Sequence, residues 1–280
     1  MSSQDAKRVA DAVNRRFGES IEVSPSLPQL DALALLNERS VCRNYRSEPL
    51  PESLFRLLCA TALSSPTKSD LQQADIVRVR DTGKRAAINA LFPSSPWIAG
   101  APEFLVFCGD GRRFRRIFEQ RGVAFANDHL DAFFNAVVDS AIVLSAFVQA
   151  AELAGLGSCP ISEVRNHAAR FSDLLELPDW VVPVAGLTLG YPVDKEFFSP
   201  RLALSATVHS DRYGSERVDA ELADYDARRI RDRPYRRQRD TARFGQAQTY
   251  GWTEDKFRQY ADRQRGDFGA FVRARRFNLE

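Results

Sequence analysis

One long apolar segment, Leu130–Ala151, constrains the fold of this chain more than any other feature. Its sequence, LDAFFNAVVDSAIVLSAFVQAA, is apolar on nearly every face of a helix of that length. A helix of this kind is normally buried in the middle of a protein. A membrane span is the alternative and needs about 20 predominantly apolar residues. Asp131, Asp139 and Glu152 leave no charge-free run of that length, so we expect a buried core helix.

The segments around this helix indicate a mixed fold. Gly155-Leu156-Gly157 is expected to end it, because glycine readily takes the left-handed conformation that caps a helix. Short buried strands are predicted at Ile76–Val79, Glu103–Cys108 and Val181–Leu189 from their length and their β-branched or aromatic content. Helices that alternate with a few such strands indicate an α+β or α/β sandwich.

Further elements are predicted on both sides of this core, and residues 202–208 are expected to be extended. Helices are expected at 4–17, 30–36, from about 51, and at 86–92, 112–120, 163–171, 218–229, 252–261 and 268–277. We interpret residues 1–28 as an N-terminal extension and 211–280 as a C-terminal helical tail with a basic block. No internal repeat or low-complexity linker divides the chain, so a single domain over 1–280 is expected.

The composition excludes few functions, but it indicates the class of protein, its kinds of partner and its cellular compartment. Hydrophobic residues make up 44 % and charged residues 27 % of the chain, which is typical of a globular protein. The formal net charge of +2 does not suggest a nucleic-acid or membrane partner. Four scattered cysteines and three scattered histidines form no metal-binding pattern, so free thiols and no metal site are expected. The beginning of the chain lacks an apolar signal core, and we expect a cytoplasmic protein.

Six short motifs follow one another between residues 30 and 210. They are RSVCRNY from Arg39, SSPTKSDLQ from Ser64, APEFLVFC from Ala101, GLGSCPISEVR from Gly155, LTLGYP from Leu187 and SPRLALSATVH from Ser199. Each motif alone is weak, but in this order they resemble the flavin-dependent nitroreductase family. The tail, with HSDRY, a basic block and RDT at 239–241, resembles the NADPH-preferring, oxygen-insensitive nitroreductase and flavin reductase subgroup.

The resemblance implies a fold, an assembly and a cofactor. Members of this family are α+β three-layer sandwiches, with a central, mostly antiparallel sheet and a long buried core helix. They are homodimers that hold FMN at the subunit interface. The partners implied here are therefore a second copy of the chain and a small-molecule electron acceptor, with no nucleic acid and no membrane.

The resemblance also assigns residues to FMN. Arg39 would face the phosphate, Arg201 would be a second phosphate cation, and Arg43 would reach the ribityl or pyrimidine side. Arg39 and Arg43 lie four residues apart and would share one face of a helical turn. The other residues assigned to the cofactor are Ser40, Ser65, Thr67, Lys68, Ser69, Gln72, Pro160, Ile161, Ser162 and Glu163. The Ser162 or Glu163 amide would lie near flavin N5, and no side chain is expected to be catalytic.

The sequence departs from the family pattern at several of these motifs. Val41 stands where a serine is usual, Asp70 replaces an asparagine, and Ser199 replaces a lysine. Ser162-Glu163 replaces a Gly-Gly pair, and its bulkier side chains would narrow the pocket or change its charge. Lys68 could compensate for part of the lost phosphate binding. These changes bear on FMN affinity and on the substrate class more than on the fold.

The basic block Arg228–Arg239 can be interpreted in three ways. A run of charges usually forms a solvated face. A nucleic-acid site is possible, but no recognition fold or interleaved aromatic residues accompany the block. The subgroup resemblance instead implies that Arg231 and Arg233 bind the 2′-phosphate of NADPH, in a stretch that looks like a mobile loop. His209 is expected to bond a backbone group, and Asp139 to be paired structurally or to lie at a dimer interface.

These inferences lead to one main hypothesis. The chain would be an FMN-dependent NADPH oxidoreductase that transfers hydride through flavin N5 to nitroaromatic, quinone or flavin acceptors by a ping-pong mechanism. The alternative is an FMN-binding member with little turnover, in a storage or regulatory role, which the departures at Val41 and Ser162-Glu163 motivate. A third hypothesis is an unrelated α/β binding protein, which would be colourless.

Overall fold

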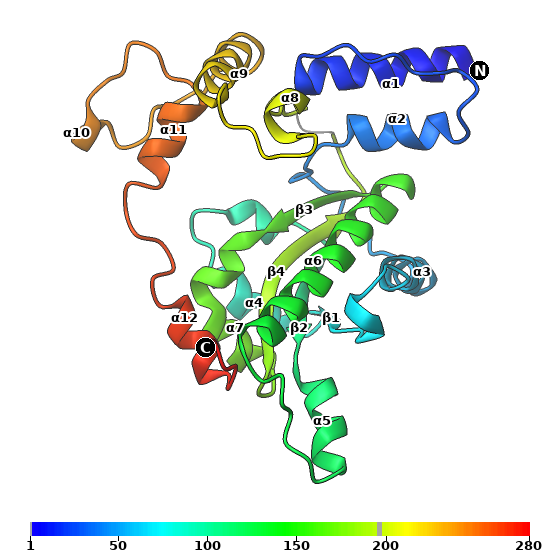
Figure 1. Ribbon diagram of the computed structural model, residues 1–280, viewed down its shortest axis with the longest axis vertical. Helices are drawn as coiled ribbons and strands as arrows, with labels where there is room; N and C mark the ends of the chain where they lie inside the picture. Colours follow the sequence, from blue (N-terminus) through cyan, green and yellow to red (C-terminus); the bar gives the residue numbers. More distant parts are fainter. Residues whose placement is uncertain (1, 195–197) are drawn as a thin grey trace. The chain divides into compact units, whose positions relative to one another are not determined.

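The computed structural model describes residues 2–194 and 198–280 and divides into two compact units (Figure 1). The helical unit comprises Met1–Ser40 and Phe197–Gln264. The sheet unit comprises Val41–Glu196 and Arg265–Glu280. The single domain expected over 1–280 stays a prediction.

Four strands form one antiparallel sheet within the described part of the sheet unit. They are β1 (Ala74–Arg78), β2 (Glu103–Asp110), β3 (Gly157–Ile161) and β4 (Val181–Gly190), in the order β1-β2-β4-β3. The three predicted strands are confirmed. Strand β3 was not predicted, because a five-residue segment that begins with glycine and contains Pro160 is unlike an ordinary strand. Proline is tolerated there because β3 lies at the edge of the sheet.

Helices cover both faces of this sheet, which confirms the three-layer sandwich. Leu105 and Phe107 of β2 pack with α3 (Glu52–Leu63) and α6 (Leu130–Leu153). The alternate residue Phe104 packs on the other face. That face is covered by α4 (Thr82–Ala90), η2 (Pro96–Ile98), η3 (Ser162–His167) and α7 (Ala168–Leu174). Two further helices, α5 (Arg112–Gln120) and α12 (Phe268–Ala274), complete the sheet unit.

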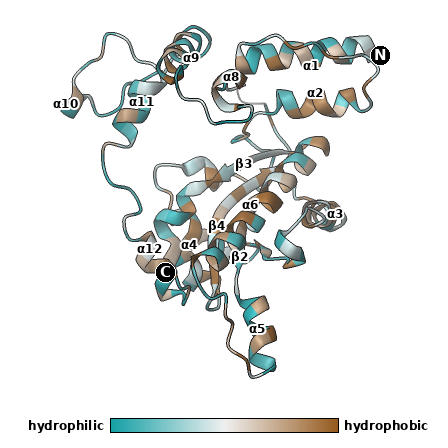
Figure 2. Cartoon of the chain, in the orientation of Figure 1, coloured by the Kyte–Doolittle hydropathy of each residue, from teal (hydrophilic) through white to brown (hydrophobic). Residues whose placement is uncertain are grey.

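The core helix α6 lies across the sheet, as predicted (Figure 1). Val143 and Phe147 on one face are buried, and brown predominates over teal along the helix (Figure 2). The helix ends at Leu153, and Gly155 follows with a φ of 74°, in the expected left-handed conformation. A second apolar face is partly open in the single chain, because Phe134 is 59 % exposed. By length and composition α6 could cross a membrane, but its buried face belongs to the core.

The helical unit contains α1 (Ser2–Phe17), α2 (Leu30–Glu38), α8 (Leu204–Thr207), α9 (Val218–Asp232), α10 (Thr241–Phe244) and α11 (Trp252–Gln259). Helices α1 and α2 lie side by side and share an apolar contact that includes Val9, Val13 and Leu30 (Figure 1). The N-terminal extension is therefore an ordered helical pair with α2.

One element prediction was wrong in type, and one predicted helix is divided. Residues 202–208 were expected to be extended, but Leu204–Thr207 forms the short helix α8, because leucine and alanine favour a helical turn where no strand pairs with them. The predicted helix at 163–171 is divided into the 3₁₀ segment η3 and the α-helix α7. The division places Ser162 and Glu163 at the start of a tight turn that follows directly from β3.

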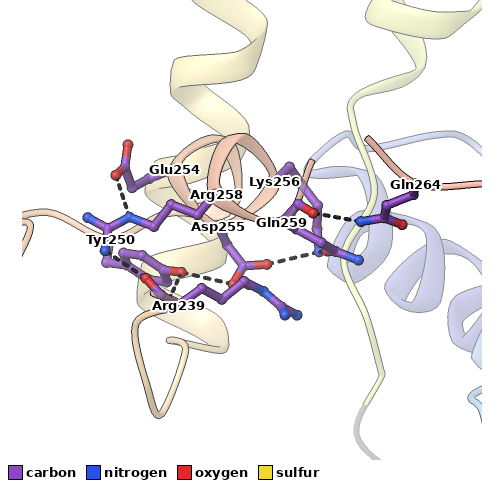
Figure 3. A network of polar contacts seen from close by, with 8 residues as sticks. All are labelled: Arg239, Tyr250, Glu254, Asp255, Lys256, Arg258, Gln259 and Gln264. Carbon is purple, nitrogen blue, oxygen red and sulfur yellow. Dashed lines mark hydrogen bonds and ion pairs between the residues drawn. The ribbon is translucent and has the colours of Figure 1, made fainter. Parts of the chain in front are cut away.

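A polar network fixes the C-terminal part of the helical unit (Figure 3). The buried Asp255 carboxylate accepts hydrogen bonds from Arg239 Nε at 2.9 Å, Tyr250 Oη at 3.0 Å and Lys256 Nζ at 2.9 Å. Burial alone would raise the pKa of Asp255, but these partners lower it below its usual value. Arg258 donates to the carbonyl oxygens of Arg239 and Gly245 at 2.8 and 2.9 Å. Arg239, the last residue of the basic block, is thus bound to the protein, although its side chain is still about half exposed.

Candidate functional site

Two of the predicted phosphate arginines line one cavity in the helical unit. The cavity has a volume of about 640 Å³, and both Arg39 and Arg201 contribute to its wall. The other lining residues are Arg16, Phe17, Leu36, Asn37, Leu202, Thr207, Tyr225 and Trp252. None of these described lining residues is acidic, so the cavity is suited to an anion.

Arg16 is a third arginine of this cavity, which the sequence analysis missed. It is only 8 % exposed, and its guanidinium lies 4.0 Å from the centroid of the Phe198 ring. Burial and the positive charges of Arg201, Arg39 and Arg15 lower its pKa to about 10. The cluster therefore holds like charges close together, a state that a bound anion would relieve.

The expectation that Arg39 and Arg43 share a helical turn was wrong. Helix α2 ends at Glu38, and residues 39–44 are irregular. Arg39 already has an extended backbone, with ψ of 135°, and farther on Cys42 N–H donates to the carbonyl oxygen of Ser158 in β3 at 3.0 Å. Arg39 and Ser40 are half-buried residues of the helical unit. Arg43 belongs to the sheet unit, where its guanidinium lies 5.2 Å from the centroid of the Trp97 ring.

The predicted flavin loop, residues 65–72, has an unusual backbone. Ser69, Asp70 and Gln72 have φ angles of 50°, 57° and 53°, a region that non-glycine residues occupy at a cost. Lys68, Ser69 and Gln72 are exposed, whereas Ser65 and Thr67 are half-buried. Thr67 Oγ1 accepts from Gln72 N at 3.3 Å, and Gln72 Nε2 donates to Asp70 Oδ1 at 3.2 Å.

The core helix holds this loop in place through one carboxylate. Asp139 of α6 is 1 % exposed, and its two oxygens accept from the backbone N–H groups of Lys68 at 3.0 Å and Gln73 at 3.2 Å. The prediction that Asp139 is structurally paired is confirmed. Because its partners flank the left-handed residues, Asp139 maintains the strained loop conformation.

A second cavity, of about 270 Å³, lies beside the same loop in the sheet unit. Lys68 and Ser69 line it, together with Leu71, Gln73, Gly111, Phe114, Arg115, Phe125, Asn127, Asp131, Ala132 and Asn135. Two buried atoms of these residues, Gln73 Oε1 and Arg115 Nε, have no hydrogen-bond partner among the described residues. A buried acceptor and a buried donor without partners are costly, and a polar ligand would satisfy them.

The predicted N5 segment lies where β3 passes into η3. Ile161 is buried, Pro160 and Ser162 are exposed, and Glu163 is half-buried. Ser162 Oγ accepts from Nη2 of Arg265 at 3.3 Å. The first N–H groups of a helical turn have no partner within the turn, so this position can offer a backbone donor to a ligand.

The two arginines assigned to NADPH stand at the end of a helix. Arg231 lies in the last turn of α9 and pairs with Asp232 at 2.7 Å, and Arg233 donates to Ser199 Oγ at 3.2 Å. Arg228, earlier in the block, is buried and donates to the carbonyl oxygen of Arg201 at 3.0 Å. The stretch 231–239 was expected to be a loop, but Arg231 and Asp232 still belong to α9, so the helix extends beyond its predicted end at Arg229.

The described residues hold no group of three or more His, Cys, Asp or Glu side chains that could bind a metal. The four cysteines, which all lie within the described ranges, are in no disulfide with one another, and Cys42, Cys108 and Cys159 are buried. His209 stacks on Tyr213, with ring centroids 4.6 Å apart. The polar and cationic residues described above are therefore the better candidates for ligand binding.

Comparison with known proteins decides the family. The model of the nitroreductase family matches residues 36–191, more than half of the chain, and the model of the family's C-terminal domain matches residues 199–280. The chain belongs to the nitroreductase family. Within it, an FMN reductase (NAD(P)H) of Bacillus subtilis is 32 % identical over 197 residues, which are 69 % of this chain and 78 % of that relative.

Two further nitroreductase-family comparisons agree with this assignment. An oxygen-insensitive NADPH nitroreductase of Salmonella typhimurium is 34 % identical over 197 residues, covering 68 % of this chain and 80 % of the relative. The structure of NfrA2 from B. megaterium matches with a TM-score of 0.79 at 27 % identity, over 89 % of this chain and 99 % of that chain. The suspected family and subgroup are thereby confirmed, and so is the fold.

Proposed function

We propose that this chain is an FMN-dependent NADPH oxidoreductase that reduces nitroaromatic, quinone or flavin acceptors by a ping-pong mechanism. The observation that carries the proposal is the cavity where Arg16, Arg39 and Arg201 gather without an acidic residue, which suits the phosphate of FMN. Relatives named as FMN reductases and an NADPH nitroreductase support it. The same names do not favour the alternative of a flavin-storing protein with little turnover.

The chain's own residues would bind and orient, while FMN, when bound, supplies a hydride-accepting N5 atom. In the helical unit, Arg39, Ser40 and Arg201 would bind the phosphate. In the sheet unit, we assign Arg43 and the N–H groups of Ser162 and Glu163 to the flavin ring. The remaining polar and apolar contacts are assigned to Ser65, Thr67, Lys68, Ser69, Gln72, Pro160 and Ile161.

The sheet-unit cavity supports a polar aromatic acceptor. Lys68 and Ser69, which we assign to the cofactor, line it, and Arg115 Nε is an unpartnered buried donor among the described residues. Nitro and quinone groups present oxygen acceptors on a flat apolar ring. Such oxygens would satisfy Arg115 Nε, and Phe114 and Phe125 would contact the ring.

We also propose a homodimer located in the cytoplasm. The apolar side of α6 that includes Leu130 and Phe134, which are 51 % and 59 % exposed, supports a partner surface. An obligate interface would bury more than about 2,000 Å². Light scattering at micromolar concentration should give twice the 31.5 kDa chain mass. A stable flavin-loaded monomer would contradict the dimer.

The test of the function is optical. We expect the purified protein to be yellow and its flavin absorbance to bleach rapidly under anaerobic NADPH, with slower bleaching by NADH. A yellow protein that NADPH does not bleach would support the storage alternative. A colourless protein that does not take up added FMN would contradict both hypotheses.

The nucleotide preference should depend on Arg231 and Arg233. These exposed or partly exposed cations are suited to the 2′-phosphate, which distinguishes NADPH from NADH. Replacing both by alanine should lower the NADPH-to-NADH ratio of kcat/KM by about 10- to 1,000-fold. The matched control replaces Arg236 and Arg237 of the same block and should leave the ratio near that of the parent. If the Arg231→Ala/Arg233→Ala variant keeps the NADPH-to-NADH ratio of kcat/KM of the parent, these two arginines do not bind the 2′-phosphate.

A further inference from the structure

The helix α1 precedes the segments that match the nitroreductase family, which begin at residue 36. Its last turn nevertheless reaches the arginine cavity through Arg16. The Arg16 guanidinium donates to three backbone carbonyl oxygens. Nε and Nη2 bond Asn37 O at 3.1 and 2.8 Å, Nη2 also bonds Arg39 O at 2.6 Å, and Nη1 bonds Ser199 O at 3.2 Å.

These three carbonyls belong to the two segments that carry the proposed phosphate ligands. Asn37 and Arg39 lie at the end of α2, and Ser199 is two residues before Arg201. The link is reciprocal, because Arg201 N–H donates to the carbonyl oxygen of Arg16 at 2.6 Å. One side chain and one carbonyl at the end of α1 therefore connect residues that are more than 150 positions apart in the chain.

We propose that Arg16 is a positioning residue for the phosphate site, which holds Arg39 and Arg201 at one cavity so that both can bind the same anion. This inference rests on the proposed FMN-dependent function. The inference gives α1 a role in cofactor binding, although α1 lies outside the residues that match the nitroreductase family.

The positive charges of the three arginines explain why the hydrogen bonds of Arg16 are needed to hold the two segments together. Burial, together with the positive charges of Arg201 and Arg39, lowers the pKa of Arg16 to about 10. Without a connection between their backbones, the two segments would separate until an anion arrived, and binding would have to supply the ordering free energy. With the connection, the site is preorganised.

The geometry requires arginine specifically. The planar guanidinium offers five N–H donors in a fixed fork, and here it bonds three carbonyls while its face packs on the Phe198 ring. A lysine would keep the charge, but its single ammonium cannot reach the carbonyls of Asn37, Arg39 and Ser199 together. The variant Arg16→Lys therefore separates positioning from charge.

The experiment compares FMN with riboflavin, which lacks the phosphate. The whole 280-residue chain, freed of flavin, is titrated with FMN and with riboflavin, and binding is followed by fluorescence quenching. The proteins compared are the parent, Arg16→Ala, Arg16→Lys and the control Arg15→Ala. Arg15 is the exposed neighbour on α1, and its replacement removes the same charge. We expect both Arg16 variants to bind FMN about 10- to 100-fold more weakly, with riboflavin binding unchanged and Arg15→Ala close to the parent.

A double-mutant cycle provides the second readout. If Arg16 acts through Arg39, then adding Arg16→Ala to Arg39→Ala should weaken FMN binding less than Arg16→Ala does alone. Equal losses for FMN and riboflavin, parent-like FMN binding by Arg16→Lys, or loss of the fold in both Arg16 variants would overturn the proposal. A parent that binds no FMN would instead contradict the proposed function itself.

Discussion

Replacing both Arg39 and Arg201 by alanine is expected to weaken FMN binding by about 100- to 10,000-fold. Each substitution removes a charge-assisted contact to the phosphate worth about 1.5–3 kcal/mol, and each 1.4 kcal/mol is a factor of ten in affinity. The fold should survive, because Arg39 is half-buried and Arg201 exposed, and neither belongs to the apolar core.

Equilibrium titration with FMN measures the loss, and retention of yellow colour through dialysis gives a simple check. The matched control replaces Arg212 and Arg217, two exposed arginines of the same unit that do not line the cavity, and should bind FMN like the parent. If the Arg39→Ala/Arg201→Ala variant keeps FMN as tightly as the parent does, the phosphate lies elsewhere.

Replacing Asp139 by alanine is expected to lower the free energy of unfolding by about 2–6 kcal/mol. The substitution leaves the buried backbone N–H groups of Lys68 and Gln73 without their acceptor, at about 1–3 kcal/mol each. The left-handed residues Ser69 and Gln72 would then be free to relax, so flavin retention should fall as well.

Urea denaturation of the parent and the variant measures this loss. The control is Asp131→Ala on the same helix, where the exposed carboxylate bonds only the nearby Asn135 side chain among the contacts described, at 2.7 Å. It should cost no more than about 1 kcal/mol. Asp139→Asn should be intermediate, because the amide keeps one acceptor oxygen. Equal stability of the Asp131 and Asp139 variants would exclude a role of Asp139 in holding the loop.

The sequence predicted those parts of the fold that depend on local apolar patterns. The core helix α6 and the strands β1, β2 and β4 were predicted within a few residues of their ends, because each is a continuous apolar run. The strand β3 was missed, since its pairing with β4 depends on a long-range partner. The predicted helical face shared by Arg39 and Arg43 was wrong because α2 ends at Glu38, and Cys42 after it bonds Ser158, a partner far along the chain.

Those residues of the candidate site that lie in family motifs could be predicted from the sequence. Arg39 and Arg201 could be identified by resemblance, and the structure places both at one cavity, although their contact with FMN stays a prediction. Arg16 could not be found in this way. Its partners are carbonyl oxygens, which every residue has, and they lie 21 or more positions along the chain. For Asp139, the polar residue in an apolar helix indicated a partner but not its identity.

The edge position of β3 has a consequence for the behaviour of the protein at high concentration. An open edge strand can recruit a strand from another molecule, which begins aggregation. On β3, however, Pro160 has no N–H to donate, and the Ser158 carbonyl is already bonded by Cys42 N–H. The same proline that hid β3 from sequence analysis therefore protects this side of the sheet from edge-to-edge association.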